Sequence, residues 1–498
     1  MSQLLSLVQL YRKFIENSDT ITLFERMIGD FIEDVSVDSS SFAAVLQIPY
    51  PTHYKSVWGL VGEWQRTLIL SLLLRELRLL DTYSPLLMER IISLSAIVVW
   101  DEFQLVTAYK AIVSLLLGQP VKKIKVIQSP SGSAPLEGGG HWSWACIPHP
   151  SFHAELGSLW DLYSVLSSDS SYLAAAEKLA QWQQHTLDVN HAPFIGLFSN
   201  EGDISEEGLL LRNYTLFSLV GRSSNRSDMA FLAEKQLEKL QDATFEDEGF
   251  FFPLATILEK IYALYGDIRT TFQLPSTFHD PDTTLLGYRS KKVSVVASLS
   301  GGGSGMGCFH FDDIQVVNFG PQHLPLGECL GFGLEGIPSD IQTSDSHDES
   351  SFSLRGIARL KSRIDSNAQH QSLANFREGE HAGIWLDTKI QFEKEKLAID
   401  ISLHHLFNPE IAFVFFVKSR FCTVDGKQKI YPRSFTHYQG DVARIDLHGN
   451  EEILTIEAKN PHEVHLVPLG GGKNFWGADF LIAYICSDKQ KNYQWSIT

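Results

Sequence analysis

VSVVASLSGGGSGMGCFHFDDIQVVNF, residues 293–319, marks the point at which the pattern of this 498-residue chain changes. Val293–Leu299 alternates and is rich in β-branched residues, a glycine-rich run follows at 301–307, and two more short apolar runs come after it, Cys308–Phe311 and Ile314–Phe319. Short alternating runs separated by turn residues predict antiparallel strands. The glycine run lacks the Lys-Ser/Thr ending of a phosphate loop and precedes a strand, so it predicts a hairpin or a bulge.

Similar short runs continue from this stretch to the C-terminus. They lie at 383–392, 397–403, 411–419, 442–447, 453–458, 464–466 and 480–486. Strands at this density, with Gly, Asn and Asp between them, are typical of an antiparallel β-sandwich, which we expect over 280–498. The polar stretch Asp340–Ser351 predicts a loop within it.

Upstream of residue 275 the apolar residues recur at three- and four-residue intervals, which indicates helices. The predicted helices cover about 57–80, 85–98, 102–117, 154–166, 172–187, 206–220, 228–240 and 253–265. The leading helices begin near residues 57, 102, 154, 206 and 253, so the helical hairpins repeat at a similar period. Such a repeat predicts an α/α toroid over 1–275. The sequence thus predicts a multidomain protein with α and β parts.

Charge and cysteine content exclude several function classes. The net charge is −18, whereas a nucleic-acid-binding protein needs a basic face. The five cysteines are scattered and show no CxxC spacing, which favours buried free thiols over disulfides or structural zinc. No apolar run is long enough to span a membrane, and the N-terminus does not read as a signal peptide. We therefore expect a cytoplasmic protein without a membrane partner or a cofactor.

One long loop is rich in side chains that suit a sugar. The stretch GGGHWSWACIPHPSFH at 138–153 contains His141, Trp142, Trp144 and His149. Indole faces stack on pyranose rings, and imidazoles bond to hydroxyl groups, so we predict that these four residues bind substrate. Alternatively, the tryptophans anchor the loop. His149 and His153 have the spacing of metal ligands on a helix, but a proline separates them and no third ligand is near, so no metal site is expected.

The pair Asn190–His191 lies in a second loop of the helical part. With the order of the two domains, it resembles the polysaccharide lyases built as an α/α toroid followed by a β-sandwich, the heparinase- and alginate-lyase-like group. The resemblance implies a carbohydrate polymer or oligosaccharide as substrate. It also implies that Asn190 neutralises the uronate carboxylate, that His191 removes the adjacent proton, and that a tyrosine protonates the leaving oxygen. Tyr214 is the candidate for that tyrosine, with Tyr262 and Tyr265 as rivals. Alternatively, Asn190 and His191 only cap a helix end.

The charge around this loop bears on the substrate. The segment 179–211 contains five acidic residues and no Lys or Arg. A polyanion would be repelled there unless a nearby arginine, Arg212 or Arg222, reaches the site. We therefore include Arg222 among the predicted substrate-binding residues.

Two alternative functions remain open. An acidic rim suits a glycoside hydrolase, in which two carboxylates act as acid and base, and Glu201 with Glu206 or Glu207 could serve. Glu206 and Glu207 could equally be first-turn residues that favour the helix dipole. A non-catalytic interaction protein on the same scaffold would use its groove for a peptide or a protein partner.

Overall fold

The chain is described by a computed structural model that divides into two compact units. The described residues are 80–96, 104–121, 123–134, 149–196, 206–240, 272–299, 305–323, 334–345, 350–361, 381–405, 411–435, 437–471, 474–486 and 490–498, with single positions between 61 and 75. The first unit comprises Met1–Ala145, Ser151–Gln183 and Glu207–Gln273. The second comprises Cys146–Pro150, Gln184–Glu206 and Leu274–Thr498.

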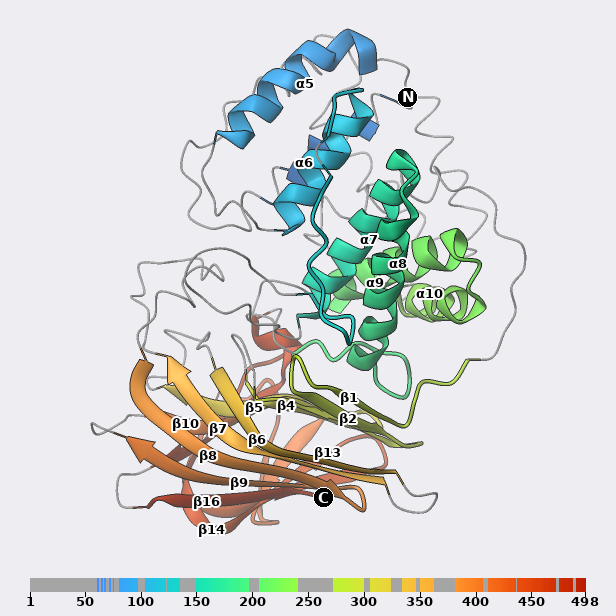
Figure 1. Ribbon diagram of the computed structural model, residues 1–498. Coiled ribbons are helices and arrows are strands. Elements are labelled where there is room, and N and C mark those ends of the chain that lie inside the picture. Colours follow the sequence, from blue (N-terminus) through green and yellow to red (C-terminus); the bar gives the residue numbers. More distant parts are fainter. Residues whose placement is uncertain are drawn as a thin grey trace. The chain divides into compact units, whose positions relative to one another are not determined.

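The first unit is helical (Figure 1). Its described helices are α5 (Leu80–Ser95), α6 (Gln104–Leu116), α7 (Pro150–Ser167), α8 (Ser170–Gln183), α9 (Glu206–Ser223) and α10 (Ser227–Leu240). Local signals explain several of their ends: Pro150 occupies a first turn, where no backbone N–H is needed, and the Asp169 carboxylate accepts the Ser171 N–H at the start of α8. No helix among the described residues combines the length and the hydropathy that a membrane span requires.

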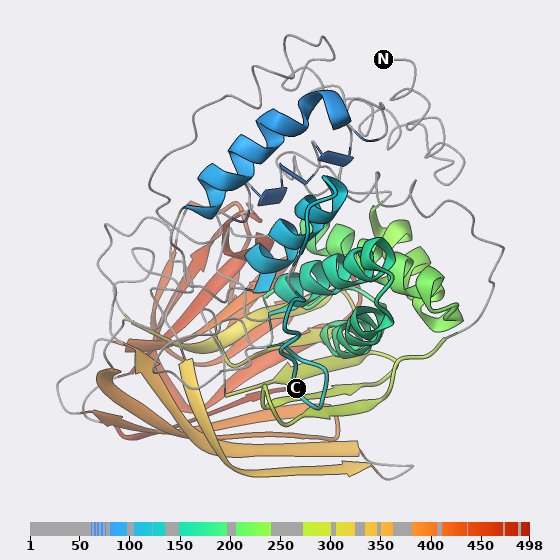
Figure 2. The same ribbon diagram turned by 45° about the horizontal axis from the view of Figure 1, so that its top comes forward.

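Large aromatic side chains fill the core of the helical unit. The most completely buried include Trp64, Trp160, Trp182 and Phe217. The helices α7, α8 and α9 approach each other closely at Gly157, where an added Cβ would lie 2.7 Å from Leu216 Cδ1. Figure 2 shows α7 to α10, in teal and green, packed side by side.

The second unit is built from strands that all pair antiparallel (Figure 1). Their order is β1-β2-β3-β4-β5-β10-β15-β14-β16-β9-β8-β7-β6, with β11, β12 and β13 attached through β14. Their bounds are β1 Thr277–Asp280, β2 Leu285–Arg289, β3 Val293–Ala297, β4 Gly307–Phe311, β5 Ile314–His323, β6 Leu334–Asp345, β7 Ser350–Lys361, β8 His381–Glu393, β9 Lys396–His405, β10 Ile411–Lys418, β11 Phe421–Val424, β12 Gln428–Ile430, β13 Tyr438–His448, β14 Ile453–Pro468, β15 Phe480–Cys486 and β16 Asn492–Ile497.

Alternation along the strands builds the core of this unit. In β9, Leu397, Ile399 and Ile401 are buried while the residues between them are half-buried, which is the period-2 pattern of a sheet with one packed face. The strand β10 is buried along nearly its whole length because both of its faces are covered. Three cysteines in the described part, Cys308, Cys422 and Cys486, are buried free thiols, which confirms the prediction for them.

The order of helical and strand-rich parts is confirmed, but not every strand was predicted. The strands outside the predicted runs are β1, β2, β6, β7, β11, β12 and β16, and two specific predictions are wrong. The stretch Asp340–Ser351 was predicted to be a loop, but β6 extends to Asp345 and β7 begins at Ser350. The runs at 453–458 and 464–466 were predicted as separate strands, whereas β14 is continuous from Ile453 to Pro468 and changes its partners along the way.

Candidate active site

Asn190 and His191 lie at the tip of a tight turn in the second unit. Before it, Gln184–Thr186 forms a single 3-10 turn, and Leu187 then bridges to Pro193. The turn is closed by two backbone hydrogen bonds, from the Asp188 N–H to the Ala192 carbonyl at 2.8 Å and from the His191 N–H to the Asp188 carbonyl at 3.0 Å. Asn190 is exposed and His191 is half-buried. His191 has a φ of 62°, a left-handed conformation uncommon outside glycine and a recurrent feature of functional sites.

The Asp188 carboxylate organises this turn from inside. Its Oδ1 accepts the backbone N–H groups of Asn190 and Ala192, both at 2.8 Å, so it holds the chain on either side of His191. Its Oδ2 lies 3.1 Å from Nδ1 of His310 on β4. Asp188 and His310 are each only 4% exposed, so water competes little with this contact. The backbone of the Asn190–His191 turn is therefore fixed by a buried side-chain pair.

Arg289 on β2 anchors the segment that leads into the turn. Its guanidinium donates to the carbonyls of Leu187 at 2.6 Å, Gln184 at 2.6 Å and Pro275 at 2.9 Å, and it lies 4.5 Å from the centre of the Phe278 ring. The planar fork of arginine can satisfy several carbonyls at once, which a lysine ammonium does not match. Three backbone carbonyls thereby gain a charged donor in a largely buried place.

Two further strands hold the turn and its exit. The Val189 N–H donates to Ser294 Oγ on β3 at 2.8 Å, and Asn318 Nδ2 on β5 donates to the Gly196 carbonyl at 2.8 Å. Since β2, β3, β4 and β5 are neighbours in the sheet, four adjacent strands fix this segment. Asn190 and His191 are thus presented from a rigid support, as precise positioning in catalysis requires.

Burial also sets the ionisation of the groups beneath the turn. Burial lowers the pKa of Arg289 to about 9, and the nearby charge of Asp188 opposes that shift, so the guanidinium stays charged at neutral pH. His185 stacks on Phe278 with ring centres 4.6 Å apart. Burial, and next the positive charge of Arg289, lowers the pKa of His185 to about 3, so this imidazole is neutral at physiological pH.

Other predicted site residues are distributed over the chain. Tyr214 lies on α9 of the first unit and is 6% exposed, and Arg222 is half-buried in the last turn of the same helix. His149 is buried directly before α7. The structure places Asn190 and His191 on one turn of the second unit, whereas Tyr214 and Arg222 belong to the first unit. The predictions that lie outside the described residues concern His141, Trp142, Trp144, Glu201, Tyr262 and Tyr265.

Arg212, a candidate for contacting a polyanion, is engaged within the helical unit. Its Nε lies 3.4 Å from Oε2 of the buried Glu155. The other oxygen of Glu155 accepts Tyr109 OH and Gln65 Nε2, both at 2.6 Å. Burial and the charge of Glu155 raise the pKa of Tyr109 well above its usual value. Arg212 therefore compensates an internal carboxylate, which limits its role toward a substrate.

Sequence reasoning missed the residues that hold the turn. Asp188 carried a readable signal, because an Asp two residues before a turn position often accepts N–H groups in an Asx-turn. Arg289 and His310 carried none, since each meets the turn from more than ~100 residues away in sequence. Among the described residues, no three His, Cys, Asp or Glu side chains converge as metal ligands.

The fold is similar to that of solved polysaccharide lyases. A heparinase III structure matches with a TM-score of 0.51 and 9% identity, over 93% of this chain and 74% of that chain. A heparan sulfate lyase from Pedobacter heparinus matches with a TM-score of 0.46 and 8% identity, over 96% of this chain and 72% of that chain. No protein-family model matches the sequence, and no curated protein is significantly similar to it. The predicted resemblance to these lyases is thus confirmed, at the level of the fold.

Proposed function

We propose that the chain is a polysaccharide lyase, with an α/α toroid over about 1–275 and a β-sandwich over about 280–498. The observation that carries the proposal is the rigid turn that presents an exposed Asn190 beside His191. The similarity to heparinase III supports the scaffold, and the Asn–His pair supplies the two functional groups that β-elimination needs first. The substrate class that fits this chemistry is a uronate-containing polysaccharide.

The proposed reaction assigns one role to each side chain. The Asn190 amide donates to the uronate carboxylate, which lowers the cost of charge developing beside it. The imidazole of His191 takes the C5 proton, and that electron pair forms the C4–C5 double bond as the C4–O bond breaks. The departing oxygen receives a proton from a tyrosine, for which Tyr214 is our candidate. Trp142, Trp144, His141, His149 and Arg222 are proposed to contact the neighbouring sugar units.

The hydrolase alternative has less support. It needs two carboxylates free to act as acid and base, with Glu201 paired to Glu206 or Glu207. Glu206 Oε2 lies 3.1 Å from Lys418 Nζ, so this carboxylate is already engaged in an ion pair within the strand-bearing unit. The interaction-protein alternative predicts no turnover of any polysaccharide, which a panel of substrates tests.

The test is a panel of uronate and neutral polysaccharides with two readouts, new ultraviolet absorbance and new reducing ends. A lyase produces both together, whereas a hydrolase produces reducing ends without the chromophore of a C4–C5 double bond. Absence of both readouts across the panel would reject both enzymatic forms and favour the interaction protein.

Variants at the turn sharpen the test. His191→Asn removes the proposed base, and asparagine tolerates the left-handed φ at this position, so the fold should stay intact. We expect kcat to fall by about 10²- to 10⁴-fold. Asn190→Ala should lower kcat by about 10²-fold or more. The matched control is His437→Asn, because His437 is exposed and lies outside the turn. Equal activity of His191→Asn and the control would exclude His191 as the base.

A further inference from the structure

A polar pocket lies where β14 changes its partners. The strand pairs with β16 through Ala458 and with β15 from Val464 onward, so the backbone between them departs from the edge of β16. The space that this opens has a volume of about 290 Å³. It is lined by β9, β14 and the start of β16. The pocket is distant in the strand order from β4, the strand whose His310 contacts the Asn190–His191 turn. Between β4 and β16 lie β5, β10, β15 and β14.

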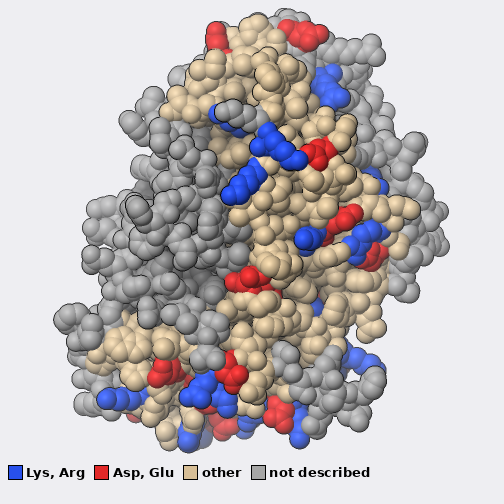
Figure 3. All heavy atoms as spheres, in the orientation of Figure 1, with Lys and Arg blue, Asp and Glu red and all other residues tan. Residues whose placement is uncertain are grey.

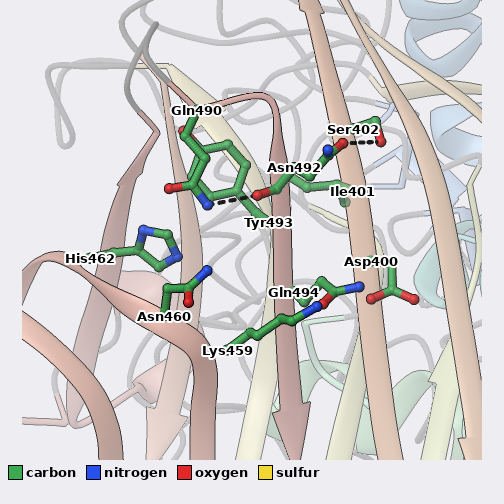
Figure 4. Close-up of a pocket in the computed structure, with 10 residues that line it drawn as sticks. All are labelled: Asp400, Ile401, Ser402, Lys459, Asn460, His462, Gln490, Asn492, Tyr493 and Gln494. Atoms are coloured by element: carbon green, nitrogen blue, oxygen red, sulfur yellow. Dashed lines mark hydrogen bonds between the residues drawn. The ribbon is translucent and has the colours of Figure 1, made fainter.

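The strand register places polar side chains around this space. Gln494 is opposite Asp400 and Asn492 is opposite Ser402, so these four residues share one face of the β9–β16 pair. The residue between, Tyr493, points into the core and is 1% exposed. Figure 4 shows Gln494 and Asp400 on one side of the pocket.

The opposite wall comes from β14. Asn460 and His462 line it, and Lys459 extends toward Gln494 and Asp400 (Figure 4). The His462 ring is buried against Tyr493, with centres 5.3 Å apart, and burial lowers its pKa, so it forms an uncharged part of the wall.

Several of these side chains have unused hydrogen-bonding capacity. Asn492 accepts Ser402 Oγ at 2.7 Å through its side chain, and Gln490 Nε2 donates to the Asn492 carbonyl at 2.7 Å. By contrast, within the described part of the chain the side chains of Asp400, Lys459, Asn460 and Gln494 make no hydrogen bond or ion pair. Two amides, one carboxylate and one ammonium therefore face a common space with donors and acceptors available.

The mixture of groups defines the ligand chemistry. One cation and one anion give the pocket no net charge, so neither an acidic nor a basic ligand is favoured electrostatically. Amides and a carboxylate beside donors match hydroxyl groups, which both donate and accept. A volume near the lower end of the roughly 300–1,000 Å³ of small-molecule sites fits one ring and not an oligosaccharide.

We propose that this pocket binds a single neutral sugar unit, as a carbohydrate subsite separate from the Asn190–His191 turn. The Asp400 carboxylate accepts hydrogen bonds from ring hydroxyls, and the Asn460 and Gln494 amides donate to them and accept from them, which provides the specificity. Lys459 closes the side facing solvent. The subsite would hold a neutral unit of a glycan chain independently of any turnover.

Saturation-transfer NMR with the full chain tests the subsite without reference to activity. The probes are methyl glucoside, methyl galactoside, methyl mannoside and N-acetylglucosamine, with glucuronate and glucosamine as charged counterparts. We expect saturable binding of at least one neutral probe, with a Kd on the order of 1 mM, as is usual for so small a ligand held by a few hydrogen bonds. The charged counterparts should bind more weakly than that probe.

Variants locate the binding. Asn460→Ala and Gln494→Ala should each weaken binding about 10-fold, the usual effect of losing one hydrogen bond, and the double variant should abolish the signal. Gln428→Ala removes an exposed amide on β12, outside the pocket, and should bind as the wild type does. Absence of binding by every neutral probe, equal binding by the double variant, or preference for glucuronate would each overturn the proposal. The Asn190 and His191 variants should leave this binding unchanged, which separates it from the proposed reaction.

Discussion

Arg289 shows at the residue scale why the Asn190–His191 turn is rigid, because one guanidinium satisfies three backbone carbonyls. We expect Arg289→Lys to lower the free energy of unfolding by about 2–4 kcal/mol, since a single ammonium leaves buried carbonyls without donors. Chemical denaturation measures this change. The control is Arg420→Lys at an exposed position, for which a change within about 0.5 kcal/mol is expected. Similar losses in the two variants would show that the fork is not required.

His185 predicts a pH dependence of stability. Its pKa is about 3 in the folded chain against 6.5 ordinarily, so the unfolded state binds an additional proton between these values. Stability should therefore fall as the pH decreases below about 6.5, by about 1.4 kcal/mol per pH unit from this group.

The comparison that isolates this contribution is His185→Phe, which keeps an aromatic ring against Phe278. Urea unfolding of both proteins at pH 7.5, 6.5, 5.5 and 4.5 gives the difference in stability at each pH. We expect the wild type to lose about 2–3 kcal/mol relative to the variant between pH 6.5 and 4.5. A difference that does not change with pH would show that His185 is protonated equally in both states.

At the scale of elements, Gly196 sets how closely the segment after the turn approaches β5. An added Cβ would lie 1.8 Å from the Val317 carbonyl oxygen, a contact that neither backbone can accommodate without moving. We expect Gly196→Ala to lower the free energy of unfolding by about 2–3 kcal/mol or more and to displace the segment that follows the turn.

The control for this prediction is Gly426→Ala, in the turn between β11 and β12. Gly426 has a φ of 66° with nothing within 4 Å of an added Cβ, so its variant measures backbone strain alone, about 1 kcal/mol. Denaturation curves of both variants give the comparison. A smaller loss for Gly196→Ala than for Gly426→Ala would mean that β5 and this segment are less closely packed than the structure shows.

The elements that sequence could predict are those with a clear period. The run 228–240 is found as α10, Ser227–Leu240, and the run 397–403 as β9, because their apolar residues keep a period of 3.6 or 2. The strands β6 and β7 were missed, since an antiparallel strand with a solvated face needs few apolar residues. Asn190 and His191 could be predicted as site residues from their residue types. Arg289 and His310 could not, because they contact the turn from distant parts of the sequence and no local pattern indicates such contacts.

At the scale of the whole molecule, neither compact unit is one continuous stretch of the sequence. The segment Gln184–Glu206 lies between helices α8 and α9 in the chain, yet it belongs to the compact unit formed by the strands. The candidate catalytic turn is therefore positioned by β2 to β5. Changes in those strands should reach Asn190 and His191 more directly than changes in the helices that flank the segment in sequence.

The net charge of −18 predicts how salt affects the proposed reaction. On the face shown in Figure 3, Lys and Arg are interspersed with Asp and Glu over the strand-bearing part, so no basic surface there offsets the overall charge. A uronate polymer is then repelled at long range, and raising the salt from 0.01 to 0.15 M shortens the screening length from about 30 to 8 Å. We expect KM to fall by about 3-fold or more while kcat stays constant, because screening assists encounter and does not alter the bound geometry.

Initial rates give kcat and KM across this salt range, measured on a uronate polymer that the protein is found to cleave. The neutral probes of the β9–β14–β16 pocket serve as the internal control, since their binding involves no net charge and should not change with salt. A KM that rises with salt would instead indicate that cations such as Arg222 attract the polymer more strongly than the net charge repels it. Electrostatic attraction, and not repulsion, would then govern substrate capture, and Arg222→Ala would be the variant to measure next.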